Sequence, residues 1–325
     1  MIHRYNRLLL ALLLGLTPLS HLKSGSSQEQ PNKTTPGTQE QPSSRISDQT
    51  YRVSVDLVNI FCSVWDQKTN AFVTTLTREN FAIYEDNRRQ EIKNFSRDMN
   101  VPLTISLLID TSQSVAPKLK FEQEAATNFF FSVLKDKDRA MLVEFDSGVT
   151  MVQDFTSDAN KLAKQIKTLR AAGGTALYDA IYLACDEKLI REMGRKTVVL
   201  LSDGEDSASK RSYEEALQMA LKAEATIFAI SVSRGGFFGV GSSKTGDRVL
   251  EQLAEETGGK VFFPFKVEEL EEAFQHISQE LRSQYNLGYL SSNTQRDGGY
   301  RKVEVKLAEK GLKMRYRRGY YAPTT

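Results

Sequence analysis

The feature that most constrains the fold is an alternation of short apolar runs and amphipathic segments over residues 101–283. The apolar runs are continuous, which predicts parallel strands buried on both faces of a sheet. The segments between them carry apolar residues at helical spacing, as Ala126, Phe129 and Val133 do. This alternation predicts an α/β fold with a doubly wound, mostly parallel Rossmann-like sheet covered by helices on both faces. The expected strands are residues 103–110, 139–145, 149–154, 196–202, 225–231 and 259–263, with 149–154 as an antiparallel edge strand.

Two blocks of β pattern flank this region. Residues 51–100 show alternating apolar positions and a hairpin, and residues 284–325 show Val303, Val305 and Leu307 in alternation. Neither block is large enough to bury an apolar face well alone. We therefore expect the two blocks to pair into a small β-sandwich, into which the α/β domain of residues 101–283 is inserted.

The N-terminus predicts export. Arg4 and Arg7 precede a short apolar core from Leu8 to Leu16, a signal-peptide pattern that is too short for a membrane-spanning helix. We expect a signal peptide over residues 1–22 and a periplasmic, cell-surface or secreted protein. The cleavage site is unclear, so an uncleaved anchor is the alternative, and membrane contact is expected only in that case. Residues 23–50, rich in Ser, Gln, Pro and Thr, predict a flexible linker.

Charge and cysteine usage narrow the class of partner. The net charge of +2 gives no strong field for nucleic acid. The tightest basic group, Arg315, Arg317 and Arg318, is interpreted as a solvated strand face. Cys62 and Cys185 each fall on an apolar face in different predicted domains, so both are expected to be buried, free thiols.

A possible metal site follows the first buried strand. The run from Leu103 to Ile109 ends in Asp110-Thr111-Ser112-Gln113-Ser114. In open α/β sheets, ligands bind at the carboxyl ends of the strands. One carboxylate and two hydroxyl groups on one loop are hard oxygen ligands that suit Mg²⁺ or Ca²⁺. Taken alone, the same residue types also fit an ordinary loop and helix cap.

Two further segments complete a recognisable pattern. Gly173-Gly174-Thr175 precedes an amphipathic helix, and a second apolar run, Val198 to Ser202, ends in Asp203-Gly204. Together the three loops resemble the metal-ion-dependent adhesion site (MIDAS) of von Willebrand factor A (VWA) domains. The matching residues are Asp110, Ser112, Ser114, Thr175 and Asp203. The resemblance implies that the two serines touch the metal directly. It also implies that the threonine and the aspartates bind it directly or through water, and that one position stays open for an acidic group of a partner.

The resemblance extends over most of residues 51–322, to a group of exported bacterial VWA-domain proteins first noted in Acidobacteria. It implies an architecture and a metal site, but no partner. The pieces that carry it are Asn80-Phe81, Tyr84-Glu85-Asp86, Gly173 to Ala180, Leu201 to Asp206, Leu281 to Tyr285 and Arg318 to Tyr321.

These observations favour a metal-dependent protein-binding module of the bacterial envelope or exterior rather than an enzyme. The expected ion is Mg²⁺, with Mn²⁺ or Ca²⁺ as alternatives, and the expected partner is a protein that offers an Asp or Glu side chain. An alternative is a structural envelope scaffold whose fold the metal stabilises, and nothing in the sequence excludes it.

Two further alternatives are disfavoured. Metal-assisted hydrolysis lacks a His, a Cys or a second acidic cluster beside the three loops to serve as base or nucleophile, so no catalytic residue is assigned. The glycine-rich segment before Asp247 does not predict a nucleotide site, because Lys244 follows Ser243 where the phosphate-binding loop requires glycine. That segment is interpreted as a flexible surface loop.

Overall fold

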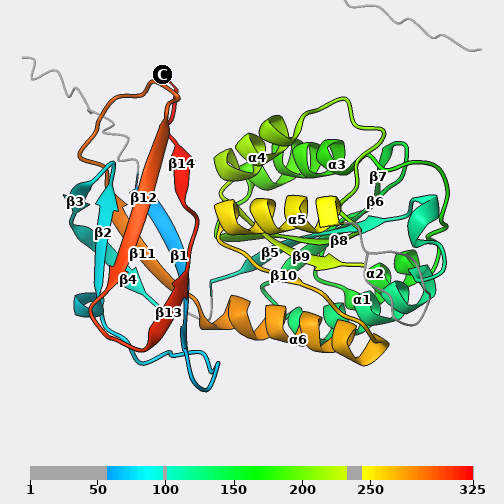
Figure 1. Ribbon diagram of the computed structural model, residues 1–325, viewed down its shortest axis with the longest axis horizontal. Helices are drawn as coiled ribbons and strands as arrows, with labels where there is room; N and C mark the ends of the chain where they lie inside the picture. The colour runs from blue at the N-terminus through cyan, green and yellow to red at the C-terminus, as the bar shows by residue number, and fades with distance from the viewer. Residues whose placement is uncertain (1–56, 98–100, 233–243, 325) are drawn as a thin grey trace, which may run out of the picture. The chain divides into compact units, whose positions relative to one another are not determined.

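The computed structural model describes residues 57–97, 101–232 and 244–324 (Figure 1). The chain divides into two units, residues 1–52 and 53–325, and all of the described structure lies in the second. The expected signal peptide and linker fall outside the described residues, and the domain boundaries within the second unit stay predictions.

A six-stranded sheet forms the centre of the α/β region, and its strand order is β10-β9-β8-β5-β6-β7. Its pairs are parallel except that β7 runs antiparallel to β6 at the edge. The mostly parallel sheet with one antiparallel edge strand is therefore confirmed. The strands are β5 (Leu103–Asp110), β6 (Arg139–Phe145), β7 (Val149–Thr156), β8 (Arg195–Ser202), β9 (Ala225–Ser231) and β10 (Val261–Phe262).

Strand β10 is shorter than the expected 259–263 because its first residues end the preceding helix. Gly258 adopts a positive φ of 82°, and Gly259 donates its backbone N–H to the carbonyl of Ala254 at 2.7 Å. This is the usual way in which a glycine terminates a helix. Gly259 therefore belongs to the turn that ends the preceding helix rather than to β10.

Helices cover both faces of this sheet (Figure 1). On one face lie α1 (Leu119–Val133), α2 (Ala159–Ile166) and α6 (Val267–Ser283). On the other lie α3 (Leu177–Leu183), α4 (Tyr213–Lys222) and α5 (Lys244–Thr257). Each layer has its own apolar core. Successive side chains of β5 point into opposite cores, so that Leu107 lies in the core under α1, α2 and α6, and Leu108 lies in the core under α3, α4 and α5. This explains why the whole strand is buried and why its sequence is continuously apolar.

The two flanking blocks form two antiparallel four-stranded sheets, with orders β13-β1-β11-β4 and β14-β12-β2-β3. Each sheet combines strands from both ends of the chain, and β1 pairs with β11 from Leu57↔Leu290 to Cys62↔Tyr285. Their facing side chains make a third apolar core that includes Ile60 and Ile83. The fold class is thus as predicted. The strands are β1 (Leu57–Asp66), β2 (Phe81–Glu85), β3 (Arg88–Gln90), β4 (Ile92–Ser96), β11 (Tyr285–Leu290), β12 (Tyr300–Leu307), β13 (Leu312–Arg315) and β14 (Gly319–Tyr321).

Four short helical turns complete the described elements: η1 (Arg78–Asn80), η2 (Gln113–Val115), the π-helical η3 (Ala184–Lys188) and η4 (Leu189–Arg191). Both cysteines are buried and free, as expected.

The interpretation of the arginine group as a solvated face is wrong for Arg315 and Arg317, which are largely covered, whereas Arg318 is exposed as expected. Each of the three arginines forms an ion pair with an acidic residue of the α/β region. The pairs are Arg315 with Glu280 at 2.7 Å, Arg317 with Glu224 at 2.9 Å and Arg318 with Glu255 at 3.1 Å. Only 8% of the Arg317 side chain is exposed, and its guanidinium also donates to the carbonyl of Asn59 at 2.8 Å. The group therefore ties β13 and the residues after it to α5, α6 and the α4–β9 turn.

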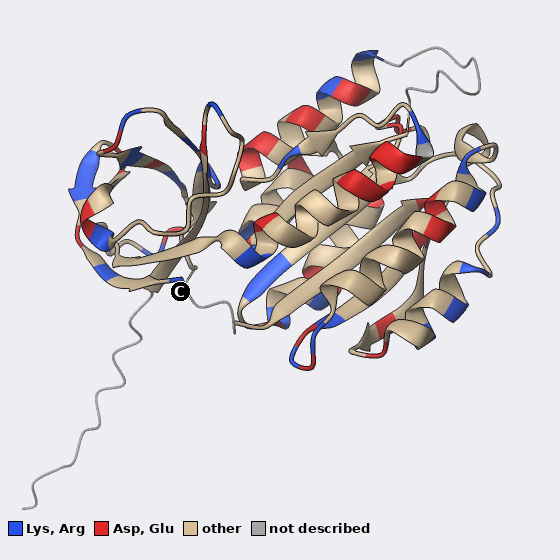
Figure 2. Cartoon of the chain, turned by 90° about the horizontal axis from the view of Figure 1, so that it is seen from below, with Lys and Arg blue, Asp and Glu red and all other residues tan. Residues whose placement is uncertain are grey.

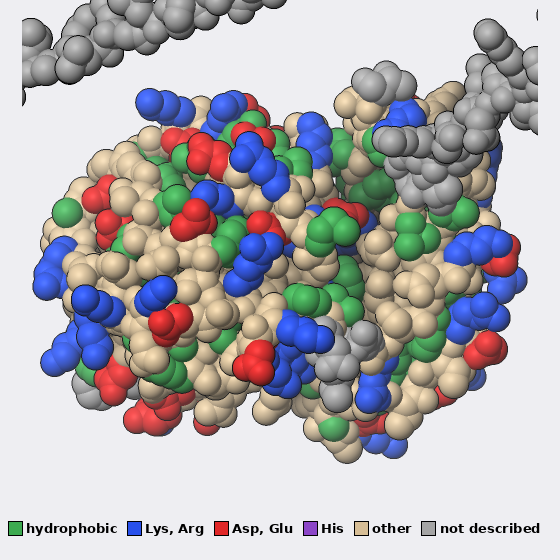
Figure 3. Space-filling model, turned by 180° about the vertical axis from the view of Figure 1, so that it is seen from behind, with side chains coloured by type: hydrophobic (Ala, Val, Ile, Leu, Met, Phe, Trp, Pro, Cys, Tyr) green, Lys and Arg blue, Asp and Glu red, His purple; other side chains and the backbone are tan. Residues whose placement is uncertain are grey.

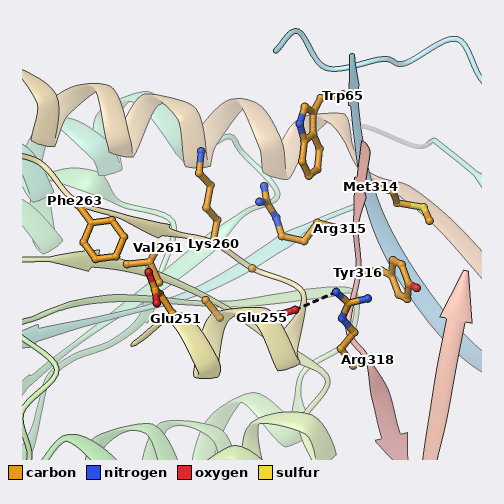
Figure 4. A pocket seen from close by; sticks show the side chains of 12 residues that line it. Trp65, Glu251, Glu255, Lys260, Val261, Phe263, Met314, Arg315, Tyr316 and Arg318 are labelled. Atoms are coloured by element: carbon orange, nitrogen blue, oxygen red, sulfur yellow. Dashed lines mark hydrogen bonds and ion pairs between the residues drawn. The ribbon is translucent and has the colours of Figure 1, made fainter. Parts of the chain in front are cut away.

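A groove of about 390 Å³ lies between β13 and the end of α5. Figure 4 shows Trp65, Arg315 and Lys260 along it, together with the ion pair of Arg318 and Glu255. The Arg315 guanidinium stacks 4.8 Å from the centre of the Trp65 ring, and the Lys260 ammonium lies 4.6 Å from the ring of Phe262. The first stacking contact lies within the sandwich and the second within the α/β region, and the ion pair of Arg318 with Glu255 joins the two sides. We therefore interpret the groove as a structural seam.

Charges of both signs are distributed along the described chain, as Figure 2 shows. On the face seen in Figure 3, acidic and basic side chains are interspersed. Within the described ranges, no helix has both the length and the apolar character that crossing a membrane requires.

Candidate metal site

Three loops meet at the carboxyl edge of the central sheet, and backbone hydrogen bonds join them. The loop after β5 is joined to the loop that holds Thr175, because Ala172 N–H donates to the Thr111 carbonyl at 2.7 Å and Gln113 N–H to the Gly173 carbonyl at 3.2 Å. The loop after β8 is joined to the same segment, because Ser207 N–H donates to the Thr175 carbonyl at 2.9 Å. The three segments singled out in the sequence therefore converge.

Asp110 is fully buried, and hydrogen bonds fix both of its carboxylate oxygens. Oδ1 accepts the backbone N–H of Ser112 at 2.9 Å, and Oδ2 accepts the hydroxyl of Ser202 at 2.7 Å. Burial raises the pKa of Asp110 to about 6, and the hydrogen bonds from Ser112 and Ser202 oppose this rise. The carboxylate is thus held in one orientation at the end of β5 and interacts electrostatically with Asp203.

The two serines form a hydrogen-bonded chain that ends on Asp203. The Ser112 and Ser114 hydroxyl oxygens are 2.9 Å apart, and the Ser114 hydroxyl donates to Asp203 Oδ2 at 2.8 Å. Asp110, Ser112, Ser114 and Asp203 therefore form one continuous polar group. Hydroxyl groups that bond to each other in this way can turn their lone pairs toward a cation without moving the backbone.

Thr175 completes the predicted set from the third loop. Its backbone N–H donates to the Ser207 hydroxyl at 3.0 Å, and the residue is buried. Its own hydroxyl has no hydrogen-bond partner among the residues that the structure describes. The structure thus ties Thr175 to the loops that hold the other four residues and leaves its hydroxyl oxygen available.

Two glycines set the position of the Asp203 loop, and the sequence interpretation missed one of them. Gly204 has a positive φ of 78°, and a Cβ on it would lie 2.2 Å from the carbonyl oxygen of Gly246. A Cβ on Gly246 would in turn lie 2.2 Å from the carbonyl oxygen of Asp203. Gly246 belongs to the first turn of α5, and the next residue, Asp247, accepts the hydroxyl of Ser231 at 2.6 Å. The start of α5 is thus anchored directly against the loop.

A further acidic residue near the site, Glu122 on α1, was also missed. It is 1% exposed, and neither of its carboxylate oxygens has a hydrogen-bond partner among the described residues. Burial raises the pKa of Glu122 well above its usual value, and Asp110 and Asp203 add to this shift. Its buried carboxylate is therefore close enough to the metal-site candidates to interact with their charges.

The chemistry of the donor atoms fits a hard divalent cation. In the described part of the chain, no three His, Cys, Asp or Glu side chains gather in the way a metal ion would need. A cation at this edge would therefore take hydroxyl oxygens of Ser112, Ser114 and Thr175 together with the aspartates. Mg²⁺ accepts such oxygen sets, usually with several waters retained. The assignment of these five residues as ligands stays a prediction.

Comparison with known proteins agrees with the fold. Residues 104–280, more than half of the chain, match the von Willebrand factor type A domain family. One similar solved structure is an aerotolerance-related membrane protein from Bacteroides fragilis (16% identity, 55% of this chain and 98% of that chain, TM-score 0.46). Another is the vWF domain of the type V pili tip protein Mfa5 from Porphyromonas gingivalis (15% identity, 55% and 94%, TM-score 0.44). A third is proximal thread matrix protein 1 from the mussel byssus with a zinc-occupied MIDAS motif (18% identity, 62% and 50%, TM-score 0.49). No curated protein matches.

Proposed function

Because the chain belongs to the von Willebrand factor type A domain family, we propose that it is an exported, metal-dependent protein-binding module. The observation that carries this proposal is the polar chain from Ser112 through Ser114 to Asp203, beside the buried carboxylate of Asp110. In this proposal the chain holds one Mg²⁺, and Mn²⁺ or Ca²⁺ can replace it. The narrower resemblance to the group first noted in Acidobacteria stays a prediction.

The balance of charge around the five residues supports capture of an acidic group. Two of the five proposed ligands are carboxylates, and the other three are neutral hydroxyls. Hydrogen bonds from the Ser112 N–H and the Ser202 hydroxyl also partly offset the negative charge of the Asp110 carboxylate. A divalent cation held in this way keeps an affinity for a further anion, which an Asp or Glu side chain of a partner protein would supply.

Binding, rather than catalysis, is proposed because the usual nucleophiles and bases lie elsewhere in the described chain. The Cys62 and Cys185 thiols are buried. His276 lies on α6 with its ring against those of Phe72 and Phe262, at 5.3 and 5.2 Å. A structural scaffold that uses the same metal only for stability is the competing proposal.

Calorimetric titration of the purified protein with Mg²⁺ tests the metal site. We expect wild type to bind and Asp110→Asn to bind much more weakly, because the neutral amide cannot stabilise the cation in the same way. Asp136→Asn is the matched control, since Asp136 is exposed in the α1–β6 connection, at the opposite edge of the sheet. Equal uptake by wild type and Asp110→Asn would refute the site.

The partner is tested separately. The immobilised protein is exposed to envelope proteins of the producing organism in Mg²⁺ and in EDTA, and Ser114→Ala is run in parallel. We expect one retained protein in Mg²⁺ that is lost with EDTA and with Ser114→Ala. Its retention should also fail when its own acidic contact residue is changed to the amide. If metal binds but retention is unaffected by EDTA, the scaffold proposal is correct instead.

A further inference from the structure

Glu122 occupies a position where an unpaired charge is unexpected. On α1 it falls in the same buried stripe as Leu119 and Ala126, which belong to the core between this helix and the central sheet. The stripe faces the sheet, so the carboxylate lies inside the protein, one helical turn from the N-terminus of α1. Charged side chains in such stripes are rarely found without a partner.

The side chain has no partner among the described residues. Both oxygens are buried and lack a hydrogen-bond donor, and no ion pair to Glu122 is present within the described ranges. Lys118 interacts with Glu122 electrostatically, yet its ammonium donates to the Val232 carbonyl. Leaving a buried polar group unsatisfied is costly, and such groups normally meet a donor, a water or an ion.

The charges around Glu122 indicate what is missing. Asp110 and Asp203 both act on Glu122, and only Lys118 opposes them. Burial and these two aspartates favour the neutral form of the Glu122 carboxyl group. A divalent cation bound to the loops would offset the charge of both aspartates and favour the ionised carboxylate. No described residue donates a hydrogen bond to the Glu122 carboxylate, whereas a hydrated cation would bring both charge and water.

We propose that Glu122 is a positioning residue of the metal site, which stabilises the bound cation through solvent from beneath the loops and links α1 to it. This inference rests on the proposed function, because it requires a metal at Asp110, Ser112 and Ser114. It adds a carboxylate outside the five-residue pattern, on a helix rather than on a strand-end loop. In metal sites, residues that act in this way typically change affinity by about 10- to 100-fold when they are replaced.

The test compares Glu122→Gln with Glu124→Gln. Both substitutions remove one negative charge from α1, but Glu124 is exposed on the opposite side of the helix. Mg²⁺ affinity is measured by calorimetry, and thermal unfolding is measured in Mg²⁺ and in EDTA. For Glu122→Gln we expect a loss of affinity of about 10- to 100-fold and a smaller metal-induced rise in Tm. In EDTA its Tm should equal or exceed that of wild type, because an unpaired buried carboxylate is gone.

A second variant, Glu122→Met, removes all hydrogen-bonding capacity at similar size and should lose affinity at least as strongly. If Glu122→Gln and Glu122→Met change the Tm in EDTA but bind Mg²⁺ like wild type, Glu122 is only structural and the inference is wrong. If Glu124→Gln loses as much Mg²⁺ affinity as Glu122→Gln, the loss results from the change in net charge and not from the position of Glu122, and the inference is again wrong. If wild type itself binds no divalent ion, the proposed function fails first, which is a distinct result.

Discussion

Gly246→Ala should damage the metal site although Gly246 is not a proposed ligand. The new Cβ would lie 2.2 Å from the carbonyl oxygen of Asp203 and 3.0 Å from the carbonyl carbon of Gly204. Non-bonded heavy atoms prefer about 3.5–4.0 Å, and the obstacle is backbone. Either α5 or the Asp203 loop must therefore move by roughly 1 Å.

The magnitude follows from two opposing effects. Inserting a methyl group where there is no space costs about 1–3 kcal/mol, and a contact with backbone places this case near the upper end. Alanine in place of glycine in a helix returns at most about 1 kcal/mol. We expect a net loss of about 2 kcal/mol in the free energy of unfolding. Because Ser114 bonds to Asp203, displacement of this loop should also lower Mg²⁺ affinity at least about tenfold, or about 1.4 kcal/mol.

Urea unfolding and calorimetry measure the two effects. Gly148→Ala is the control, because a Cβ there would meet nothing within 4 Å in the β6–β7 turn. If Gly246→Ala matches Gly148→Ala in both stability and Mg²⁺ affinity, the contact between α5 and the Asp203 loop does not position the site.

Three further outcomes are expected. Arg317→Met should lower the free energy of unfolding by about 1–3 kcal/mol, because it removes a buried donor from Glu224 and Asn59. Arg318→Met should lower it by less than about 1 kcal/mol, because its ion pair is exposed; equal losses for the two variants in urea unfolding would contradict this. The native protein at pH 8 should resist thiol reagents, because burial raises the pKa of Cys62 far above its usual value and that of Cys185 to about 12. Both thiols should react once the protein is unfolded; rapid labelling of the native protein would show that at least one thiol is accessible. Mg²⁺ at 100 times its Kd should stabilise the fold by about 2.7 kcal/mol, and EDTA should abolish the gain; an unchanged Tm would argue against a metal bound only by the native state.

The predictable part of the fold is the part whose pattern is set by local burial. Strand β5 could be recognised because both of its faces meet helices, which requires an unbroken apolar run. The convergence of Asp110 and Asp203 follows from parallel strands ending at one edge. The ion pair of Arg317 with Glu224 could not be found in this way, because its two residues are far apart in the chain and either one alone resembles a surface residue.

Glu122 was predictable in part. It precedes Ala126 by four residues and is thus in phase with the apolar face of α1, where a carboxylate is out of place. The helical periodicity predicts which apolar positions are buried, but it does not predict that Glu122 is buried with them. Gly246 gave no such signal, since a glycine near a glycine-rich segment is typical of loops. Only the three-dimensional contact with Asp203 reveals its role.

The pairing of Leu57 with Leu290 has a consequence for the order of events during biosynthesis. Strand β1 emerges from the ribosome early, but its partners β11 and β13 are made only after the entire α/β insertion. Until then β1 to β4 present unpaired edges and apolar side chains, the condition in which strands aggregate. Long-range pairing of this kind also slows folding. Strands β1 to β4 are therefore prone to aggregate until β11 to β14 have been synthesised. A chaperone that binds nascent chains should raise the yield of soluble full-length protein more than it raises the yield of the isolated α/β region.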